Sequence, residues 1–363
     1  MNVVVIAIAI VVGLVVLWPR ESPTFDRLAF GFADDVIPAT VDSVVNGPCS
    51  YAADLTCDTV VFMGGSGETF TQEFPDETGQ PQLEAGDPVY LSLVVAEDDS
   101  TSVSYYDRNR GPLLLVVALI FAVAVVALGR MRGVAALFGL AISVAILIWF
   151  IVPAIIIGRD AVMVALVGGG AIVLISLYLA HGYTPLTHVA AIGAFGALAL
   201  TTALSWVVVE FAQFTGLASE EAFYLLALPD IDLTGLLLAG IVLGVIGALD
   251  DVTVTQASAV WEVGGADPNL DQRSLFDSGL RIGRDHIAST VNTLLLAYAG
   301  AAMPLLILYS LSGLSLRVVG SSEVVAVEII RTLVGSIGLV AAVPITTWLA
   351  ATQMKRIAGP SET

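Results

Sequence analysis

The hydrophobic residues of this chain gather in eight long runs rather than in short alternating segments. Each run holds about 17 to 26 residues with few or no Asp, Glu, Lys or Arg, and about 20 apolar residues cross a hydrocarbon core as a helix. The runs are residues 2–18, 112–129, 134–157, 161–180, 188–209, 233–249, 291–313 and 327–352. Strands of a membrane barrel alternate over about ten residues. The pattern therefore predicts an all-α polytopic membrane protein with about eight transmembrane helices.

Residues 20–110, between the first and second runs, follow a different pattern. Apolar and polar residues alternate over short stretches, which are separated by turn-forming sequences at 64–67 and 85–88. The alternating stretches are residues 39–45, 59–62, 88–95 and 102–106. About five short strands in this length predict a small β-rich domain, either a barrel of the OB type or a sandwich.

These patterns divide the chain into four parts. They are an N-terminal transmembrane anchor (1–19), the β-rich domain (20–110), a seven-helix membrane domain (111–354) and a tail (355–363). The first run lacks a basic leader and a small-residue cleavage site, so an uncleaved anchor is favoured over a signal peptide. Within the membrane domain, residues 250–290 are polar and form either a re-entrant segment or a surface helix.

Basic residues in the short connections predict the orientation in the cell membrane. They follow the second run, separate the sixth from the seventh, and follow the eighth: Arg130, Arg132, Arg273, Arg281, Arg284, Lys355 and Arg356. Eight helices place these three segments on one side, and the excess of Lys and Arg marks it as cytoplasmic. Both termini are therefore expected to be cytoplasmic and residues 20–110 extracytoplasmic.

The net charge of -19 is concentrated in the β-rich domain. Residues 20–110 hold 17 of the 33 acidic residues and four of the 14 basic ones, a net charge of -13. Solubility or adaptation to salt is the simpler interpretation, and a cation-attracting vestibule is the alternative. Both cysteines, Cys49 and Cys57, lie in this segment, and their spacing outside the membrane predicts a disulfide. A metal site is less favoured, since no His accompanies them.

The sixth run leads directly into adjacent carboxylates, Asp250 and Asp251. If the helix continues, Asp251, Thr255 and Ser258 share one face, and Gln256 lies nearby. Carboxylate and hydroxyl oxygens suit a hard cation, and a buried carboxyl can carry a proton. A helix broken at Asp250 would add backbone carbonyls. The competing interpretation is that both acids end a helix at the membrane surface.

A second polar stripe leads into the seventh run. On one helix, Arg281, Asp285, Ser289 and Asn292 share a face, and His286 lies on the adjacent one. These residues either line a polar pathway or only bond between helices, with Arg281 and Asp285 paired at i,i+4. His286 is a candidate metal ligand or proton relay, although a structural role is the more frequent one.

Three smaller features complete the set of candidates. Glu323, Glu328 and Arg331 open the eighth run, where Glu328 and Arg331 at i,i+3 suit a partly buried ion pair that acts as an outer gate or an anchor. His181 and His188 flank a Gly-Pro turn, and a plain turn is favoured over a metal site. The glycines at 168–170, 193 and 196 either permit close helix packing, which is the favoured interpretation, or mark breaks in the helices.

The chain lacks the Walker A, GxSxG, HExxH and CxxC patterns. We therefore expect no enzyme activity, no nucleotide or flavin cofactor and no nucleic-acid partner. A bound metal ion is the one exception kept open, with Asp250, Asp251 and His286 as its candidate ligands.

Three segments carry a resemblance to a known family. Residues 249–262, 280–294 and 329–339 resemble the signature sequences of the YibE/F-like family, actinobacterial type, and the resemblance extends from about residue 110 to 352. It implies a multi-pass bacterial membrane protein with an extracytoplasmic β-rich N-terminal part and a transport activity. It implies no catalytic residues.

These observations lead to two functional hypotheses. The first is a transporter of a small inorganic ion, with a divalent cation as the first candidate. An anion bound by Arg281, Arg284 and Arg331 is its variant. The second is a membrane scaffold or sensor whose outer domain binds an envelope partner, with homo-oligomerisation also considered.

Overall fold

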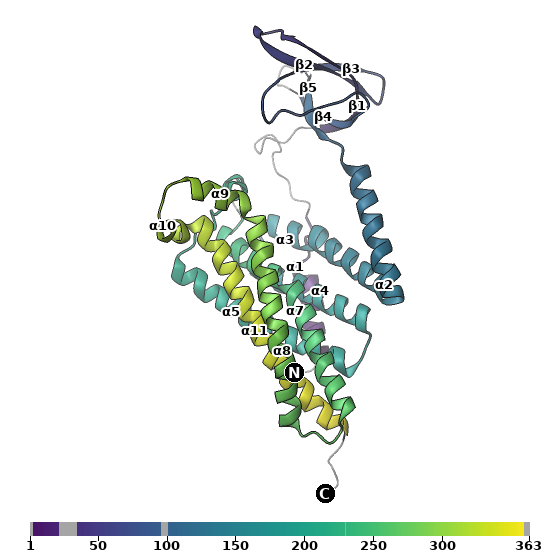
Figure 1. Ribbon diagram of the computed structural model, residues 1–363, viewed down its shortest axis with the longest axis vertical. Coiled ribbons are helices and arrows are strands. Elements are labelled where there is room, and N and C mark those ends of the chain that lie inside the picture. The colour runs from purple at the N-terminus through teal and green to yellow at the C-terminus, as the bar shows by residue number, and fades with distance from the viewer. Residues whose placement is uncertain (1–2, 22–34, 96–100, 229, 359–363) are drawn as a thin grey trace. The chain divides into compact units, whose positions relative to one another are not determined.

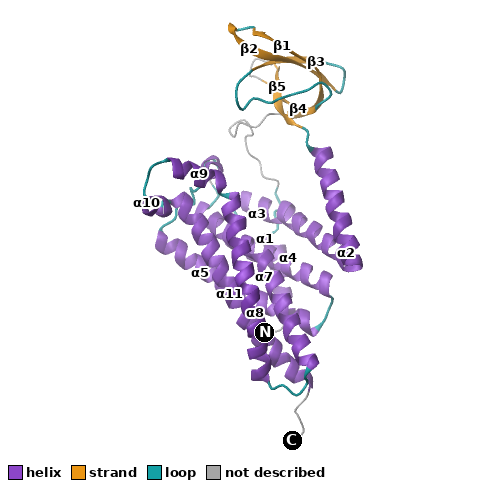
Figure 2. Ribbon diagram, in the orientation of Figure 1, coloured by secondary structure: helices purple, strands orange, loops and turns teal. Residues whose placement is uncertain are grey.

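The computed structural model describes residues 3–21, 35–95, 101–228 and 230–358. The chain divides into two compact units, one of Thr24–Ala124 and one of Met1–Pro23 with Val125–Thr363. The first contains the β-strands and the second most of the helices (Figures 1 and 2). The first residues of the predicted anchor and the tail beyond residue 358 lie outside the described residues.

The β-unit is built on one antiparallel sheet in the order β3-β2-β1-β4-β5. Its strands are β1 (Asp35–Cys49), β2 (Ala52–Gly64), β3 (Thr69–Pro75), β4 (Pro88–Val95) and β5 (Thr101–Arg108). The sheet curls so that its edge strands meet. The contact between them is a hydrogen bond of 2.7 Å from the backbone N–H of Tyr105 on β5 to Gln72 Oε1 on β3. The result is a half-barrel rather than a two-sheet sandwich.

The apolar face of this sheet forms its own core. Val41, Phe62 and Leu91 are buried within it, and Tyr105 stacks on Phe62 with ring centroids 6.2 Å apart. The four predicted strands are confirmed. β3 was not predicted individually, although Phe70, Gln72 and Phe74 alternate with outward residues. The disulfide is also confirmed: Cys49 and Cys57 are bonded near the tip of the β1–β2 hairpin.

The remaining regular secondary structure of the described chain is helical. The helical elements are α1 (Val3–Leu17), α2 (Gly111–Ile146), a π-helical turn (Leu147–Ile151), α3 (Val152–Ile156), α4 (Ala161–His181), α5 (Pro185–Ala212), α6 (Glu220–Leu225), α7 (Leu233–Ala266), α8 (Gln272–Ala301), α9 (Met303–Leu311), α10 (Leu316–Ser321) and α11 (Glu323–Ala358). Asp232 and Asp271 begin α7 and α8 by accepting hydrogen bonds from backbone N–H groups of the first turn. Asp271 therefore has a pKa below its usual value, chiefly because of hydrogen bonds from Ser274.

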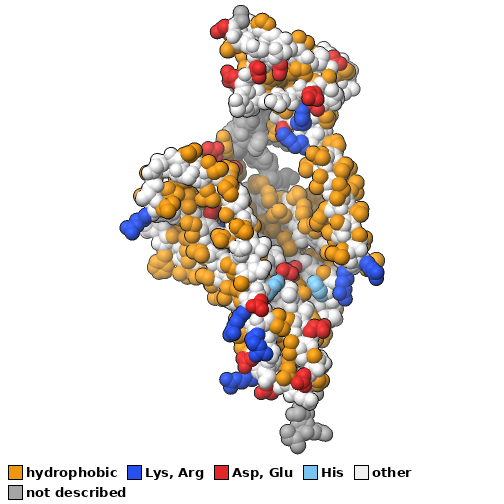
Figure 3. Space-filling model, in the orientation of Figure 1, with side chains coloured by type: hydrophobic (Ala, Val, Ile, Leu, Met, Phe, Trp, Pro, Cys, Tyr) orange, Lys and Arg blue, Asp and Glu red, His pale blue; other side chains and the backbone are white. Residues whose placement is uncertain are grey.

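Five helical stretches are long and apolar enough to cross a membrane. They are Gly111–Ile156, Ala161–His181, Pro185–Ala212, Leu233–Ala266 and Glu323–Ile357. The α8–α9 pair, bent by 65°, makes a sixth if it is one span. Figure 3 shows hydrophobic side chains over much of the visible bundle surface, and Trp149, Trp206 and Phe211 are among the exposed ones. This apolar exterior is that of a membrane protein.

The predicted total of about eight spans depends on how two segments are counted. The predicted runs 112–129 and 134–157 lie on either side of Arg130, where the backbone leaves the helical conformation (φ 49°, ψ -128°). The chain turns sharply there and passes so close to itself that a Cβ on Gly133 would meet the backbone oxygen of Val125. The first run, α1, has 15 residues and is shorter than a typical span. The total of eight therefore stays a prediction.

α7 is the central helix of the bundle, with α4, α5, α8 and α11 packed around it. Glycines allow the close approaches, as predicted. Gly169 on α4 receives the side chain of Ile246 from α7. Between α5 and α11 the contacts are reciprocal: Gly193 faces Thr346, and Gly338 faces Thr201.

Replacing Gly338 by Ala should destabilise the helical unit by about 1–3 kcal/mol, because the new Cβ would overlap Thr201 Oγ1. The same change at Gly300, which has open space around it, is the matched control and should leave the melting temperature unchanged or slightly higher. Thermal unfolding of the purified protein measures both. Equal melting temperatures for the two variants would contradict this packing.

Candidate functional site

Asp250 lies inside the bundle, on the side of α7 that faces α4. Its Oδ2 accepts a hydrogen bond of 2.6 Å from the Ser176 hydroxyl of α4, and its Oδ1 is buried without a hydrogen-bond partner among the described residues. α7 runs unbroken from Leu233 to Ala266, so the alternative of a helix break at Asp250 is wrong. The carboxylate is therefore held by a continuous helix against a neighbouring one.

A cavity of about 540 Å³ opens beside this carboxylate, between α2, α4 and α7. Its polar lining consists of Ser143, Ser176, His181 and Asp250, and the remaining lining is apolar or glycine. Among the described residues, no Lys or Arg lines it. The cavity therefore offers oxygen atoms and one imidazole, with no fixed basic group to balance the carboxylate.

The other predicted residues of α7 do not join Asp250. Asp251 and Thr255 share a face as predicted, but that face is exposed, and Ser258 beside them is half-buried. Thr253 is buried and donates to the backbone oxygen of Asp250 at 3.2 Å. The structure thus separates the two adjacent aspartates, one to the interior and one to the outside.

Gln256 ties three helices together. It is buried, and its Nε2 donates to the backbone oxygen of Gly279 on α8 at 2.8 Å and to Thr347 Oγ1 on α11 at 2.7 Å. Gln256 therefore joins α7 to α8 and α11, a structural role that the sequence did not predict.

The polar stripe of α8 faces outward. The exposed residues are Arg281, Arg284, Asp285, Ser289 and Asn292. The inward face instead carries Leu275, Gly279, Gly283 and Leu294. Arg281 donates to Ser278 Oγ at 2.8 Å, and the predicted pair with Asp285 is not among the ion pairs of the described chain. These residues therefore lie on the exposed face of α8, and none of them lines the cavity of Asp250.

His286 is half-buried, and its Nε2 is buried without a partner among the described residues. Over the same residues, no three His, Cys, Asp or Glu side chains come together as a metal site. The tentative metal set of Asp250, Asp251 and His286 is thus not brought together: Asp250 faces α4, whereas Asp251 is exposed.

The loop between α4 and α5 forms a turn in which His188 contacts its sequence neighbours. His188 Nδ1 lies 2.5 Å from the backbone oxygen of Thr184, and its ring packs against Tyr183 with centroids 4.3 Å apart. His181 points elsewhere, since it lines the cavity of Asp250. The two histidines therefore have separate surroundings.

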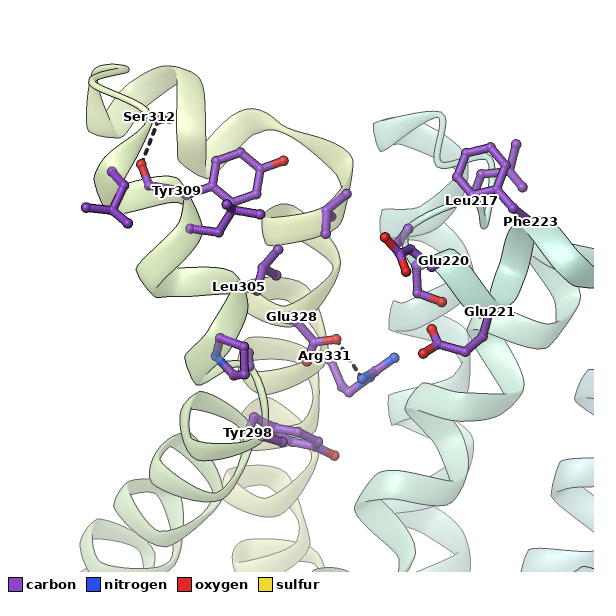
Figure 4. A pocket seen from close by; sticks show the side chains of 18 residues that line it. Leu217, Glu220, Glu221, Phe223, Tyr298, Leu305, Tyr309, Ser312, Glu328 and Arg331 are labelled. Atoms are coloured by element: carbon purple, nitrogen blue, oxygen red, sulfur yellow. Dashed lines mark hydrogen bonds and ion pairs between the residues drawn. The ribbon is translucent and has the colours of Figure 1, made fainter. Parts of the chain in front are cut away.

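A second cavity, of about 1060 Å³, lies at the end of the bundle that carries α6 and α9 (Figure 4). The predicted ion pair is confirmed in its lining: Arg331 Nη1 donates to Glu328 Oε1 at 2.8 Å, and both side chains are about a quarter exposed. Glu323 acts as an anchor, because it accepts bonds from the backbone N–H groups of Thr215 and Gly216 at 2.8 and 2.9 Å.

Ser176 is not among the predicted site residues. It lies in an otherwise apolar run, where a lone serine is a weak signal because it can bond to its own helix. Glu220 and Glu221, which line the second cavity, were also not predicted, since they lie in a short segment between two spans.

The comparisons with known proteins identify the helical unit. The family model described as YibE/F-like protein matches residues 117–356. The chain belongs to the YibE/F-like family. The match runs from α2 to α11 and includes Ser176, Asp250 and Arg331, so the resemblance of the signature sequences is confirmed. No curated protein and no solved structure matches the chain significantly.

Replacing Gln256 by Leu should destabilise the protein by about 1–3 kcal/mol, because the Gly279 carbonyl and the Thr347 hydroxyl lose their buried partner. Thr255→Val, on the exposed face one residue away, is the control and should change stability by less than about 0.5 kcal/mol. Thermal unfolding distinguishes them. A Gln256→Leu variant as stable as the control would contradict a structural role.

Proposed function

We propose that this protein of the YibE/F-like family is a membrane permease for a small inorganic ion, and that Asp250 is its ion-binding acid. The proposal rests on the surroundings of the Asp250 carboxylate. One oxygen is bonded to Ser176, the other is buried without a partner among the described residues, and a cavity opens beside them. Ionisable groups at such positions in membrane helices mark pathways for ions or protons.

The chemistry favours a cation over an anion. A carboxylate removed from water is costly unless a cation or a proton neutralises it, and among the described residues no Lys or Arg lines the cavity. The arginines of the anion variant lie elsewhere: Arg281 and Arg284 are exposed on α8, and Arg331 is paired with Glu328.

The choice of cation follows from the ligands. Asp250 and Ser176 provide oxygen atoms, which hard cations prefer. A divalent cation stays the first candidate. Asp250 and Ser176 would supply two of its ligands, and waters would complete its coordination shell. A proton carried by the same carboxylate is the candidate coupling ion, and His181 on the cavity wall is a residue through which it could pass.

The orientation is proposed from the distribution of basic residues. Lys355, near the end of α11, donates to the backbone oxygen of Pro268 at 3.1 Å, so the α7–α8 turn and the end of α11 lie together. The positive-inside rule makes this the cytoplasmic end. Under that assignment, α6 and α9 lie at the outer end, and the β-unit is extracytoplasmic.

The test is ion flux into liposomes that contain the purified protein, measured for divalent cations, monovalent cations and oxyanions with and without a pH gradient. Asp250→Asn should lower the flux of the transported ion at least about tenfold, since loss of a charged ligand is worth more than 1.4 kcal/mol. Asp251→Asn, one residue away but exposed, is the matched control and should transport like the wild type.

Two outcomes would oppose the proposal. Equal flux in Asp250→Asn and wild type would remove Asp250 from the pathway. Absence of flux for every ion in well-folded protein would favour the scaffold or sensor, in which the β-unit binds an envelope partner and the buried polar residues only join helices.

A further inference from the structure

The cavity between α6, α8, α9 and α11 has the size and lining of a site for an organic molecule. Its volume of about 1060 Å³ is at the upper end of small-molecule pockets, which typically hold about 300–1,000 Å³. Leu305 and Leu308 of α9 and Phe223 of α6 belong to its largely apolar lining. It shares no lining residue with the cavity of Asp250.

Charges of opposite sign lie on its opposite walls. On α11, Arg331 is bonded to Glu328 through Nη1 alone, and Nη2 has no hydrogen-bond partner among the described residues. Figure 4 shows the guanidinium extending away from Glu328 toward the wall formed by α6. The positive end of this ion pair therefore faces across the cavity.

The facing wall is acidic. Glu220 and Glu221 of α6 both line the cavity, and Figure 4 shows them on the side opposite Glu328. The pKa of Glu221 is lowered from its usual value by hydrogen bonds from its own backbone N–H and from Ser219, so this carboxylate is charged at neutral pH. No ion pair joins either glutamate to Arg331 among the described residues.

The position of the guanidinium is set by its surroundings. Its Cζ lies 5.9 Å from the centre of the Tyr298 ring, within the range of a cation–π contact. Tyr298 packs against Gly244 of α7. A Cβ at position 244 would overlap the Tyr298 hydroxyl, so only glycine fits there. Arg331 is thus held in place before any ligand binds, which lowers the entropy cost of binding.

We propose that this cavity binds a zwitterion with an apolar portion. Its carboxylate or phosphate would lie at Arg331, its ammonium group at Glu220 and Glu221, and its apolar part against α9. Two sources carry this chemistry, a free amino-acid-like solute and the headgroup of an ethanolamine phospholipid. The proposal goes beyond the inorganic-ion permease and does not depend on Asp250.

The test uses three probes of similar shape: L-leucine, its decarboxylated amine isopentylamine, and its deaminated acid 4-methylpentanoate. Binding to the full-length purified protein is measured by calorimetry. Leucine should bind at least about tenfold more tightly than either single-charge probe, because only leucine can contact Arg331 and the two glutamates at the same time. Dihexanoyl phosphatidylethanolamine and the phosphatidylglycerol of equal length form the lipid arm.

Variants assign each end of the ligand. Glu220→Gln with Glu221→Gln should reduce leucine affinity to that of 4-methylpentanoate and leave the affinity for this acid unchanged. Arg331→Gln with Glu328→Gln, which removes both charges together, should abolish the preference for leucine over isopentylamine. Glu210→Gln, exposed at the end of α5 and outside the cavity lining, is the matched control and should bind leucine like the wild type.

The outcomes separate this proposal from the ion permease. Asp250→Asn should bind leucine normally whether or not it transports ions. Binding of the ethanolamine lipid without binding of leucine would identify the lipid as the source. If leucine binds, an equal affinity for leucine and isopentylamine, or for leucine and 4-methylpentanoate, would overturn the proposal. If leucine does not bind, equal binding of the ethanolamine lipid and the phosphatidylglycerol, or no binding of either by folded protein, would overturn it. The glutamate variants decide the matter even if the Arg331 variant fails to fold, because Glu220 and Glu221 are exposed.

Discussion

Accommodating the half-buried Asp250 carboxylate between α4 and α7 is the main physical constraint on the helical unit. A buried charge without a counter-charge is strongly unfavourable, and the one side-chain hydrogen bond to this carboxylate among the described residues comes from the Ser176 hydroxyl on α4. The helical unit tolerates this arrangement because a cavity beside the carboxylate leaves room for a neutralising ion or proton. This cost to stability is what our proposal explains, because it makes Asp250 the residue that binds the ion.

The packing around α7 explains how the site is held. α4, which carries Ser176, approaches α7 closely because Gly169 accepts the side chain of Ile246. On the other side, Gln256 bonds α7 to both α8 and α11. α7 is therefore fixed from several directions, and the carboxylate and the serine hydroxyl keep their distance of 2.6 Å without any contribution from a loop.

Much of the architecture could be predicted from the sequence, because it follows from local patterns. Apolar runs, alternating strands, the Cys49–Cys57 disulfide and the Glu328–Arg331 pair all depend on residues close in sequence. The site was less predictable. Helical periodicity groups Asp251 with Thr255, yet it cannot tell which face of α7 turns inward, and the structure turns Asp250 inward instead. Ser176 was missed because its partner is 74 positions away.

The most direct test of the account is the effect of ions on the stability of purified wild-type protein and its Asp250→Asn variant. If Asp250 binds an ion, that ion should stabilise the wild type by about 2.7 kcal/mol at a hundredfold excess over its dissociation constant. The stabilisation should vanish in Asp250→Asn, although this variant without ions should be at least as stable as the wild type, because it buries no charge. Equal stabilisation of both proteins by the same ion would contradict the account.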